Sequence, residues 1–485
     1  MNFDLILKNG KIVFPYADLV EADIGIKEGK VVSITRNIER SSGSRTIDLG
    51  GKPVMPGVID AHSHFGIYRP LLEDAASESR AAVTGGITTV LNIIRPRPYY
   101  LNASGSLKSL LEELLAGSKN SFIPDYGYTL APVERSHLQE IEELVREGVN
   151  TFKFFMHYRN FKFSEEPYDA GFLYDLMKVV ARTSNRHSGN VRLSIHCEDP
   201  EIIRVSGQTG IGIKEPDTIH SDGSSGSVEK DPENALEAYY DARPPEVEAL
   251  AVGRAIQMAF YTKCPINILH ITSRLAMNAA VRLPQALDGV DVTREVVIHH
   301  LVLTTALNHG VLAKVNPPIR HDVDVEALWY ALQNGQVDVV ASDHATTPRK
   351  MKEGGVWRAM FGFGGNTLLL PLLISEGFHR RGLPLTRIAQ LVSGNPAKIY
   401  GLSPRKGSIS IGQDADFVVI DLKKRVRVTP ELLNSSQEYT PFDGYNVDGW
   451  PYLTIIRGSI VYEDGTVTGK PGFGDFIRRP VSDSA

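Results

Sequence analysis

Residues 54–64, VMPGVIDAHSH, decide the fold of this chain of 485 residues. An apolar run leads directly into His62 and His64, and near-continuous apolar runs are typical of strands in a parallel sheet that is covered on both faces. Side chains alternate along a strand, so two histidines two residues apart point to the same side and can bind one metal ion. The stretch predicts a buried strand that ends in a metal-binding pair.

The same rhythm, a short apolar strand followed by a helical segment, repeats through the middle of the chain. Seven more strands are expected in ITTVLNII (87–94), YGYTLA (126–131), TFKFFM (151–156), RLSIHC (192–197), INILHI (266–271), EVVIHH (295–300) and VDVVASD (337–343). Helical segments alternate with them, such as LKSLLEELL (107–115), HLQEIEELVREG (137–148), PPEVEALAVGRAIQMAF (244–260) and VEALWYALQNG (325–335). Eight such units predict a (β/α)8 TIM-like barrel with its active site at the C-terminal strand ends.

Both ends of the chain have another pattern, of short alternating strands separated by turns. It extends from Phe3 to about Leu49 and returns after Arg405 in KGSISIGQDADFVVIDL and YLTIIRGSIVYEDGTV. The two ends are therefore expected to build one small β-sandwich. The expected division is 1–53 and 405–470 for the sandwich, 54–404 for the barrel and 471–485 for a C-terminal tail.

A polar segment rich in Gly and Ser, from Ser206 to Asn234, interrupts the barrel rhythm. Loops of this length in a compact domain are usually either lids or surface insertions without a role. Both interpretations are open for this segment.

Composition limits the classes of partner. The formal net charge of −5 lacks the basic excess that binds nucleic acid or anionic lipid, and no apolar stretch is long enough to span a bilayer. The first residues, MNFDLILKNGKIVF, do not resemble a secretory signal, and the two cysteines, Cys197 and Cys264, suit a reducing compartment. We expect a cytoplasmic protein with a small-molecule partner, without nucleic-acid or membrane binding.

Three further candidate ligands, His196, His270 and Asp343, stand at the ends of later predicted strands. Each alone could be a core histidine or a helix-capping aspartate, but together they recur at one end of the barrel. Four histidines and a carboxylate suit ions such as zinc, with manganese or cobalt as substitutes.

Lys153 is unusual because it stands inside the apolar strand TFKFFM, where an unpaired ammonium is costly to bury. The side chain could extend to the rim and keep its charge in water. Alternatively, it reacts with CO2, and the resulting carbamate changes the charge from positive to negative and bridges two cations. The second interpretation is favoured.

Taken together, these residues resemble the cyclic amidohydrolases of the amidohydrolase superfamily, which are the hydantoinases, dihydropyrimidinases, allantoinases and dihydroorotases. Motifs in family order span nearly the whole chain: PGVIDAHSH, GGITTVLN, TFKFFMHY, IHCE, ILHIT, EVVIHHLVLT, KVNPPIR, DVVASDH, GNPAKIYGL and KGSISIGQDADFVVID. The resemblance implies two divalent ions, zinc in the first place, and a homodimer or homotetramer. His62 and His64 would bind the more buried ion, His196 and His270 the more exposed one, and carboxylated Lys153 would bridge them.

The resemblance also implies a reaction, which is hydrolysis of a C–N bond in a hydantoin-like or dihydropyrimidine-like ring by a hydroxide that bridges the ions. Asp343 would bind the buried ion and carry the proton from water to the ring nitrogen. Tyr158 matches the tyrosine that polarises the scissile carbonyl, although without the resemblance it would be an aromatic residue at the barrel rim. Substrate contacts are expected from Arg95, Asn316 and Gly364.

Departures from the family pattern bear on the substrate. Dihydroorotases have an arginine two residues after the second histidine, whereas Phe65 and Gly66 follow His64 here, which argues against dihydroorotate. Arg95 and Arg97 could still receive an anionic group. FGFGGNTLLLP and YTPFDGYNVDGWPYLTIIRG are closer to the allantoinase and hydantoinase branch. Allantoinase or dihydroorotase activity, hydrolysis of an acyclic amide, deamination, and an inactive scaffold remain alternatives.

Overall fold

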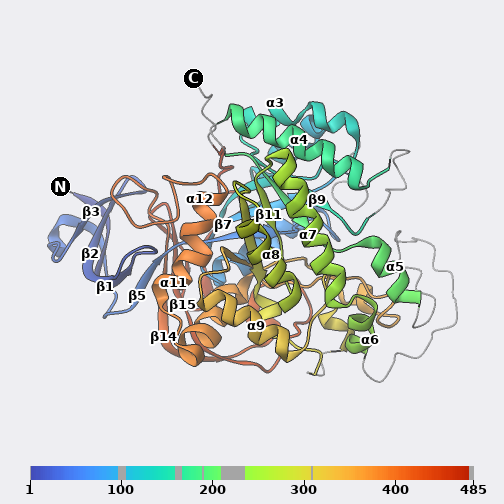
Figure 1. Ribbon diagram of the computed structural model, residues 1–485. Coiled ribbons are helices and arrows are strands. Elements are labelled where there is room, and N and C mark those ends of the chain that lie inside the picture. The colour runs from blue at the N-terminus through green and yellow to red at the C-terminus, as the bar shows by residue number, and fades with distance from the viewer. Residues whose placement is uncertain are drawn as a thin grey trace.

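The computed structural model describes residues 2–96, 105–158, 167–187, 190–208, 235–306 and 310–479. Two sheets dominate this part of the chain (Figure 1). The first is a row of eight parallel strands, β6 (Val58–Ser63), β7 (Ile87–Ile94), β8 (Asp125–Leu130), β9 (Thr151–Phe155), β10 (Arg192–His196), β11 (Ile266–Ile268), β12 (Val292–Val297) and β13 (Val339–Ala341). All eight predicted barrel strands are therefore confirmed, within a few residues at their ends.

The row of strands curves until its first and last members meet. Ser63 forms a parallel bridge with His344, just beyond β13, and Ser342 donates its backbone N–H to Asp60 Oδ1 at 3.0 Å. This seam closes the barrel, which confirms the predicted fold class. It also brings the ends of β6 and β13, and the candidate ligands that follow them, next to each other.

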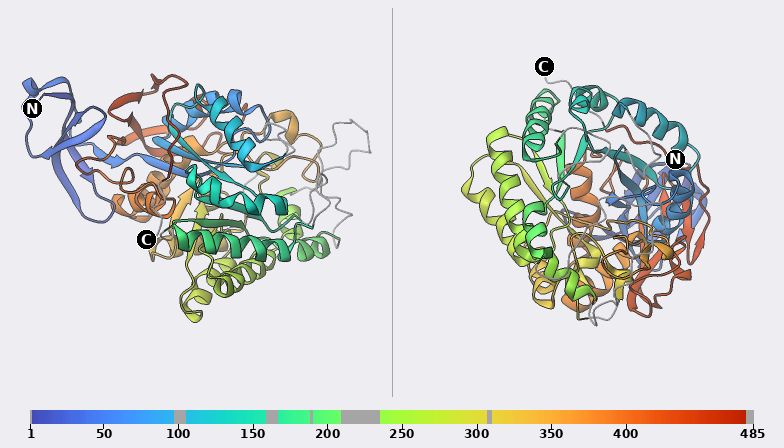
Figure 2. Two further views of the ribbon diagram at one scale, coloured as in Figure 1. Left: turned by 90° about the horizontal axis from the view of Figure 1, so that it is seen from above. Right: turned by 90° about the vertical axis from the view of Figure 1, so that its right-hand side faces the viewer.

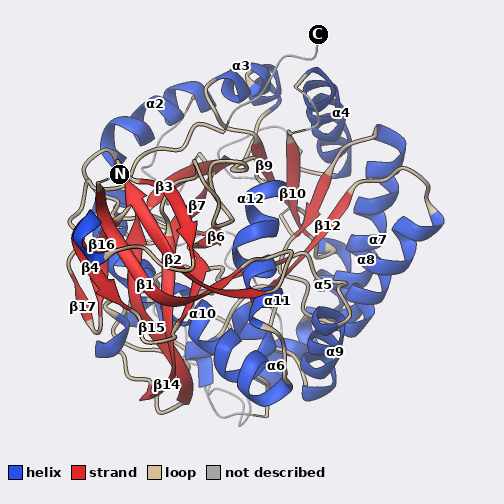
Figure 3. Ribbon diagram, turned by 90° about the vertical axis from the view of Figure 1, so that its left-hand side faces the viewer, coloured by secondary structure: helices blue, strands red, loops and turns tan. Residues whose placement is uncertain are grey.

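Helices surround the barrel (Figure 3). They are α1 (Leu71–Thr84), α2 (Leu107–Ser118), α3 (Ile141–Arg146), α4 (Ala170–Arg186), α5 (Pro200–Gln208), α6 (Ala235–Ala242), α7 (Pro245–Thr262), α8 (Arg274–Ala286), α9 (Asp322–Gln333), α10 (Leu369–Leu372), α11 (Leu385–Ala389) and α12 (Asn395–Ile399). Side-chain caps fix several starts: Ser106, Asp169 and Ser273 accept hydrogen bonds from the first-turn N–H groups of α2, α4 and α8. None of the helices in the described ranges has the length and apolar character of a bilayer span.

One predicted helix, residues 137–148, is divided into a short 3-10 turn, Arg135–Gln139, and α3. The reason is the buried His137 side chain. Its Nδ1 accepts the Val133 N–H at 3.2 Å and its Nε2 lies 3.0 Å from the Gly105 carbonyl oxygen, so the turn is tied inward before α3 begins.

The second sheet joins the two ends of the chain, as predicted, and lies at one side of the barrel (Figure 2). Its order is β17-β16-β15-β14-β5-β1-β2-β3, with β4 paired to β1. The bounds are β1 (Phe3–Val13), β2 (Leu19–Lys27), β3 (Lys30–Thr35), β4 (Gly43–Asp48), β5 (Pro53–Pro56), β14 (Phe417–Arg427), β15 (Asn446–Ile456), β16 (Ser459–Glu463) and β17 (Thr466–Val467). Residues from both ends, such as Ile12, Val54, Phe417 and Leu453, share one apolar core.

The segment expected to be a C-terminal tail lies against the barrel as far as Arg479. Phe476 bridges to Tyr126 of β8, and the fully buried Arg479 donates hydrogen bonds to the Gly148 carbonyl and to Thr151 Oγ1, both at 3.2 Å. Of the predicted insertion, residues 206–208 end α5, and the remainder lies outside the described residues. Arg97 lies outside them as well.

Candidate metal centre and active-site cavity

The structure brings the six predicted ligands together at one end of the barrel. His62 and His64 come from the end of β6, Lys153 from β9 and His196 from the end of β10, while His270 and Asp343 stand two residues beyond β11 and β13. The imidazoles form a row whose centroid distances are 5.2 Å from His64 to His62, 5.4 Å from His62 to His270 and 4.4 Å from His270 to His196. Parallel strands that end at one edge explain why residues so distant in sequence converge.

One group of donors consists of His62, His64 and Asp343. Asp343 Oδ1 lies 3.2 Å from His62 Nε2 and 3.3 Å from His64 Nε2, and the two Nε2 atoms are 3.2 Å apart. Glu295 Oε1, at 2.7 Å from His62 Nδ1, holds the other side of that ring and directs Nε2 toward the group. Three donor atoms that face one another at this spacing fit a bound cation.

Charges in this group also favour a cation. Burial lowers the pKa of His64 to about 4, so its imidazole is in the neutral form that binds metals. Burial alone would raise the pKa of Asp343, but the neighbouring His62 and His64 imidazoles hold it well below its usual range. The group therefore offers the neutral His64 imidazole and an ionised carboxylate at neutral pH.

The second group contains His196, His270 and Lys153. His196 Nε2 lies 2.6 Å from Glu198 Oε2, which also accepts a hydrogen bond from Arg243 Nη1 at 2.7 Å. Within the described ranges, His270 Nδ1 and Lys153 Nζ are buried without a hydrogen-bond partner. Such orphaned atoms need an explanation, and a bound ion is one.

Burial lowers the pKa of Lys153 to about 8, and it lowers the pKa values of His196 and His270 well below the usual range. An appreciable fraction of Lys153 is therefore a neutral amine near neutral pH. A neutral amine is the form that can react with CO2.

Backbone strain marks two of the ligands. His270 and Asp343 have φ angles of 34° and 49°, in the left-handed region that residues other than glycine rarely adopt. Strain of this kind costs about 1–3 kcal/mol per residue and concentrates at functional sites. Here it turns the chain sharply where each of the two ligands follows its strand.

A cavity with an empty volume of about 670 Å³, its opening included, lies over the ligands. Arg95, Tyr158 and Asn316 line it, and the Arg95 guanidinium carbon lies 5.1 Å from the centre of the Tyr158 ring. Gly362 lines the cavity, whereas the predicted contact Gly364 is not among the lining residues, and an added Cβ there would come within 3.1 Å of the His344 ring. A substrate contact by Gly364 stays a prediction.

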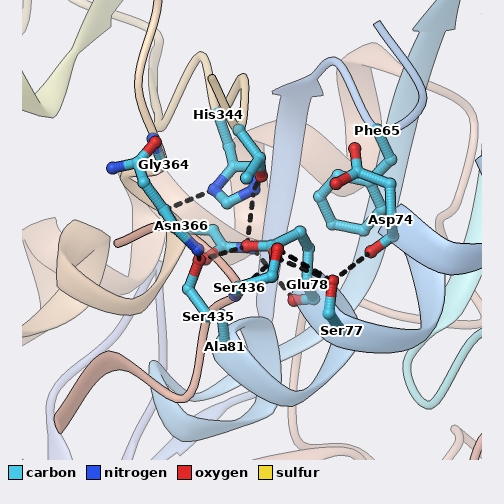
Figure 4. A network of polar contacts seen from close by, with 12 residues as sticks. Phe65, Asp74, Ser77, Glu78, Ala81, His344, Gly364, Asn366, Ser435 and Ser436 are labelled. Atoms are coloured by element: carbon cyan, nitrogen blue, oxygen red, sulfur yellow. Dashed lines mark hydrogen bonds and ion pairs between the residues drawn. The ribbon is translucent and has the colours of Figure 1, made fainter. Parts of the chain in front are cut away.

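A buried polar network supports the seam between β6 and β13 (Figure 4). Glu78 of α1 is fully buried, and its Oε2 lies 3.2 Å from His344 Nε2. Its carboxylate also accepts hydrogen bonds from Ser435 Oγ at 2.6 Å and from the Ser436 N–H at 3.0 Å. The His344 carbonyl in turn accepts the N–H of the ligand His64 at 2.7 Å.

Sequence reasoning missed several residues of the site. Glu295 and Glu198 brace histidines, Glu78 braces the seam, and His157 lines the cavity beside His196. A carboxylate in an apolar strand, such as Glu295 in REVVI, was an available signal. So was the position of His157, directly after the predicted strand that carries Lys153.

A closed parallel barrel whose strand ends gather histidines, a lysine and an aspartate around one cavity is characteristic of metal-dependent hydrolases. Residues 54–461 match the amidohydrolase family, and the chain belongs to this family.

Known relatives cover the whole chain. It is 31% identical over 490 residues to an L-hydantoinase of Paenarthrobacter aurescens and 32% identical over 483 residues to an allantoinase of Rubrobacter xylanophilus, and in both cases 98% of each chain is covered. Among solved structures, the L-hydantoinase (dihydropyrimidinase) from Arthrobacter aurescens superposes with a TM-score of 0.86 at 30% identity, covering 98% of this chain and 100% of that chain.

Proposed function

We propose that this protein hydrolyses a C–N bond of a cyclic amide, in a hydantoin-like or dihydropyrimidine-like ring, with two divalent ions and a carboxylated Lys153. The observation that carries this proposal is the Lys153 amine, which is buried without a hydrogen-bond partner among the described residues at the convergence of the candidate metal ligands. The names of the relatives, hydantoinase and allantoinase, support the reaction class.

In this proposal, His62, His64 and Asp343 hold the more buried ion, and His196 and His270 hold the more exposed one. A carbamate on Lys153 would hold both ions, since two cations close together need an anionic ligand. Zinc suits the imidazole-rich set, with manganese or cobalt as substitutes. When bound, the ions would supply hydroxide at neutral pH and polarise the ring carbonyl.

The chain's own groups handle the proton and the oxyanion. Asp343 directs Oδ1 toward His62 and His64, which leaves Oδ2 to accept the proton of the attacking water and pass it to the ring nitrogen. Tyr158 lies in the cavity lining and would donate its hydroxyl hydrogen to the developing oxyanion. Arg95, Asn316 and Gly364 would contact the remainder of the ring.

A neutral ring is the preferred substrate. Gly66, two residues after the second histidine, has no side chain, and the neighbouring Phe65 is fully buried and stacks on Phe122 with ring centroids 5.8 Å apart. Neither residue contributes a group for a carboxylate. Loss of a charge-assisted contact costs an anionic substrate about 2–5 kcal/mol. Allantoin remains a second candidate because allantoinases are among the relatives.

Location and assembly are part of the proposal. The buried, unpaired Cys197 and Cys264 support a reducing, cytoplasmic environment. We expect a homodimer or homotetramer.

The test is steady-state turnover of zinc-loaded protein on hydantoin, dihydrouracil, allantoin, a cyclic imide, dihydroorotate and an acyclic amide. We expect a neutral ring to be opened without release of ammonia. We also expect two metal ions per chain. Ammonia release would favour deamination, and an absence of turnover with an absence of bound metal would favour a scaffold. A value of kcat/KM for dihydroorotate above all neutral rings, removed by Arg95→Ala, would refute the substrate assignment.

A further inference from the structure

We propose that His157 is an additional ligand of the ion assigned to His196 and His270, so that the metal centre contains five histidines. The inference rests on the metal centre of the proposed function and adds a residue to it. His157 follows β9, the strand that carries Lys153, and lines the same cavity as Lys153, His196 and His270.

The position of the ring is the first observation. The His157 centroid lies 4.1 Å from that of His196, and the two planes are tilted by 47°, so the row of imidazoles continues by one member beyond His196. The Tyr158 ring centroid lies 4.0 Å from that of His157. His157 is thus in contact with both a predicted metal ligand and the predicted carbonyl-polarising tyrosine.

Unsatisfied polar atoms are the second observation. His157 Nδ1 is buried without a hydrogen-bond partner in the described part of the chain, and so is Oε1 of the fully buried Glu198. Donor atoms of His157, His196 and Glu198 all lie within 4.8 Å of one another. An orphaned buried nitrogen is destabilising, and coordination to an ion would remove that penalty.

Packing alone does not account for a histidine at this position. The ring is in contact with His196, Tyr158 and Phe155, surroundings in which a phenyl ring would bury its surface without an unsatisfied nitrogen. Coordination uses the nitrogen that packing leaves unpaired. A third imidazole on the exposed ion would hold it more tightly and favour zinc or cobalt over manganese, because imidazole suits the former ions and oxygen ligands the latter.

The test compares wild-type protein with His157→Phe, which keeps an aromatic ring between His196 and Tyr158 but has no donor atom. Each is loaded with Zn²⁺, and the ions are removed by titration with a competing chelator while metal per chain is measured. We expect the variant to bind one ion with wild-type affinity and the second ion about tenfold or more weakly. Loss of an outer-shell partner already weakens metal binding by about tenfold, and loss of a direct ligand should cost at least as much. Loading with Co²⁺ should give a visible spectrum that differs from that of wild type.

His187→Phe is the matched control, because His187 is also buried but caps the C-terminus of α4, outside the cavity lining. It should bind both ions as wild type does. If His157→Phe does not fold, as judged by circular dichroism, His157→Ala is measured in the same way. Unchanged second-ion affinity and an unchanged Co²⁺ spectrum in the folded variant overturn the inference alone. Wild-type protein with fewer than two ions contradicts the proposed function, and the inference with it.

Discussion

Single residues in the centre depend on burial for their chemistry, and Lys153 is the clearest case. An ordinary lysine, with a pKa near 10.4, is a neutral amine in only about one molecule in 2,500 at pH 7. Burial lowers the pKa of Lys153 to about 8, which raises this fraction to about one in ten by the same relation. Desolvation therefore prepares the amine for CO2 before any ion is present.

The activation of metal-free protein by CO2 and metal should consequently depend on pH. At a fixed concentration of dissolved CO2, its rate should rise nearly tenfold from pH 6 to pH 7 and level off above pH 8, because the amine loses its proton through that range. The measurement is the initial rate of activity recovery in buffers of known CO2 content. A rate that still rises nearly tenfold from pH 8 to pH 9 would mean that the amine is not desolvated.

Removal of the amine gives a separate prediction. Lys153→Ala should lose at least one ion per chain and its turnover, because the anion that holds two cations together is absent. Elemental analysis and activity measure this, and added short carboxylic acids should restore part of the activity. Full metal content with normal turnover would exclude a bridging carbamate.

Asp343→Asn separates metal binding from proton transfer. The remaining ligands should retain most of the metal, whereas kcat should fall by about two orders of magnitude or more because the amide cannot accept the proton. Metal analysis of the same preparation provides the control. A rate within a few-fold of wild type would require another base.

At this scale the sequence was informative where a ligand ends an apolar strand, as His196 and Asp343 do. It did not identify Glu295, because its partner His62 is brought near only by the folded barrel. It did not identify Glu198 either, which lies two residues after its partner His196 but also pairs with the distant Arg243.

Elements are held in place by contacts between segments distant in sequence. His344 illustrates this: its Nδ1 accepts the Gly365 N–H at 3.1 Å, so its proton is on Nε2, which faces Glu78. Through its carbonyl, the same residue fixes the backbone of His64. Glu78 is therefore a positioning residue for the seam that carries His64 and Asp343 (Figure 4).

Glu78→Gln should disturb this seam. A glutamine amide with its NH2 toward His344 Nε2–H would place two hydrogen-bond donors face to face. We expect a loss of about 1–3 kcal/mol in stability, the cost of an unsatisfied buried group, and a fall in kcat larger than the change in KM. Ser435→Ala, which removes a single neutral donor to Glu78, should reduce stability and kcat less than Glu78→Gln does. Equal kinetic parameters in Glu78→Gln and wild type would limit Glu78 to a structural role.

Element types were predictable from periodicity, and element ends were less so. The segment 137–148 has a helical pattern throughout, yet the contacts of His137 with residues 133 and 105 interrupt it. Such an interruption depends on a distant carbonyl, that of Gly105, which no local pattern contains.

The whole molecule depends on the junction between the barrel and the sheet built from the chain ends. The similar strand texture of both ends predicted that they meet. The residues that join them to the barrel were not predicted, because each resembles an ordinary surface charge in the sequence. Lys406 is the central one, and its Nζ is 2.7 Å from Oδ2 of Asp125, the first residue of barrel strand β8. It also pairs with Asp416 and lies 3.5 Å from Asp414.

Lys406→Met should destabilise the protein by about 3–5 kcal/mol, because its side chain is only 2% exposed and its loss leaves buried carboxylates without their central cation. Lys30→Met is the matched control: Lys30 also pairs with Asp414, at 2.6 Å, but its side chain is 45% exposed and Asp414 keeps Arg405 as a partner, so its loss should cost at most about 1 kcal/mol. Denaturant unfolding of both variants provides the two free energies.

The fraction of Lys406→Met that remains folded should keep wild-type turnover, since the cluster is not part of the cavity lining in the described chain. Equal stability losses in the two variants would show that burial of Lys406 does not fasten the two parts, and a folded but inactive Lys406→Met would show that the junction also shapes the active site.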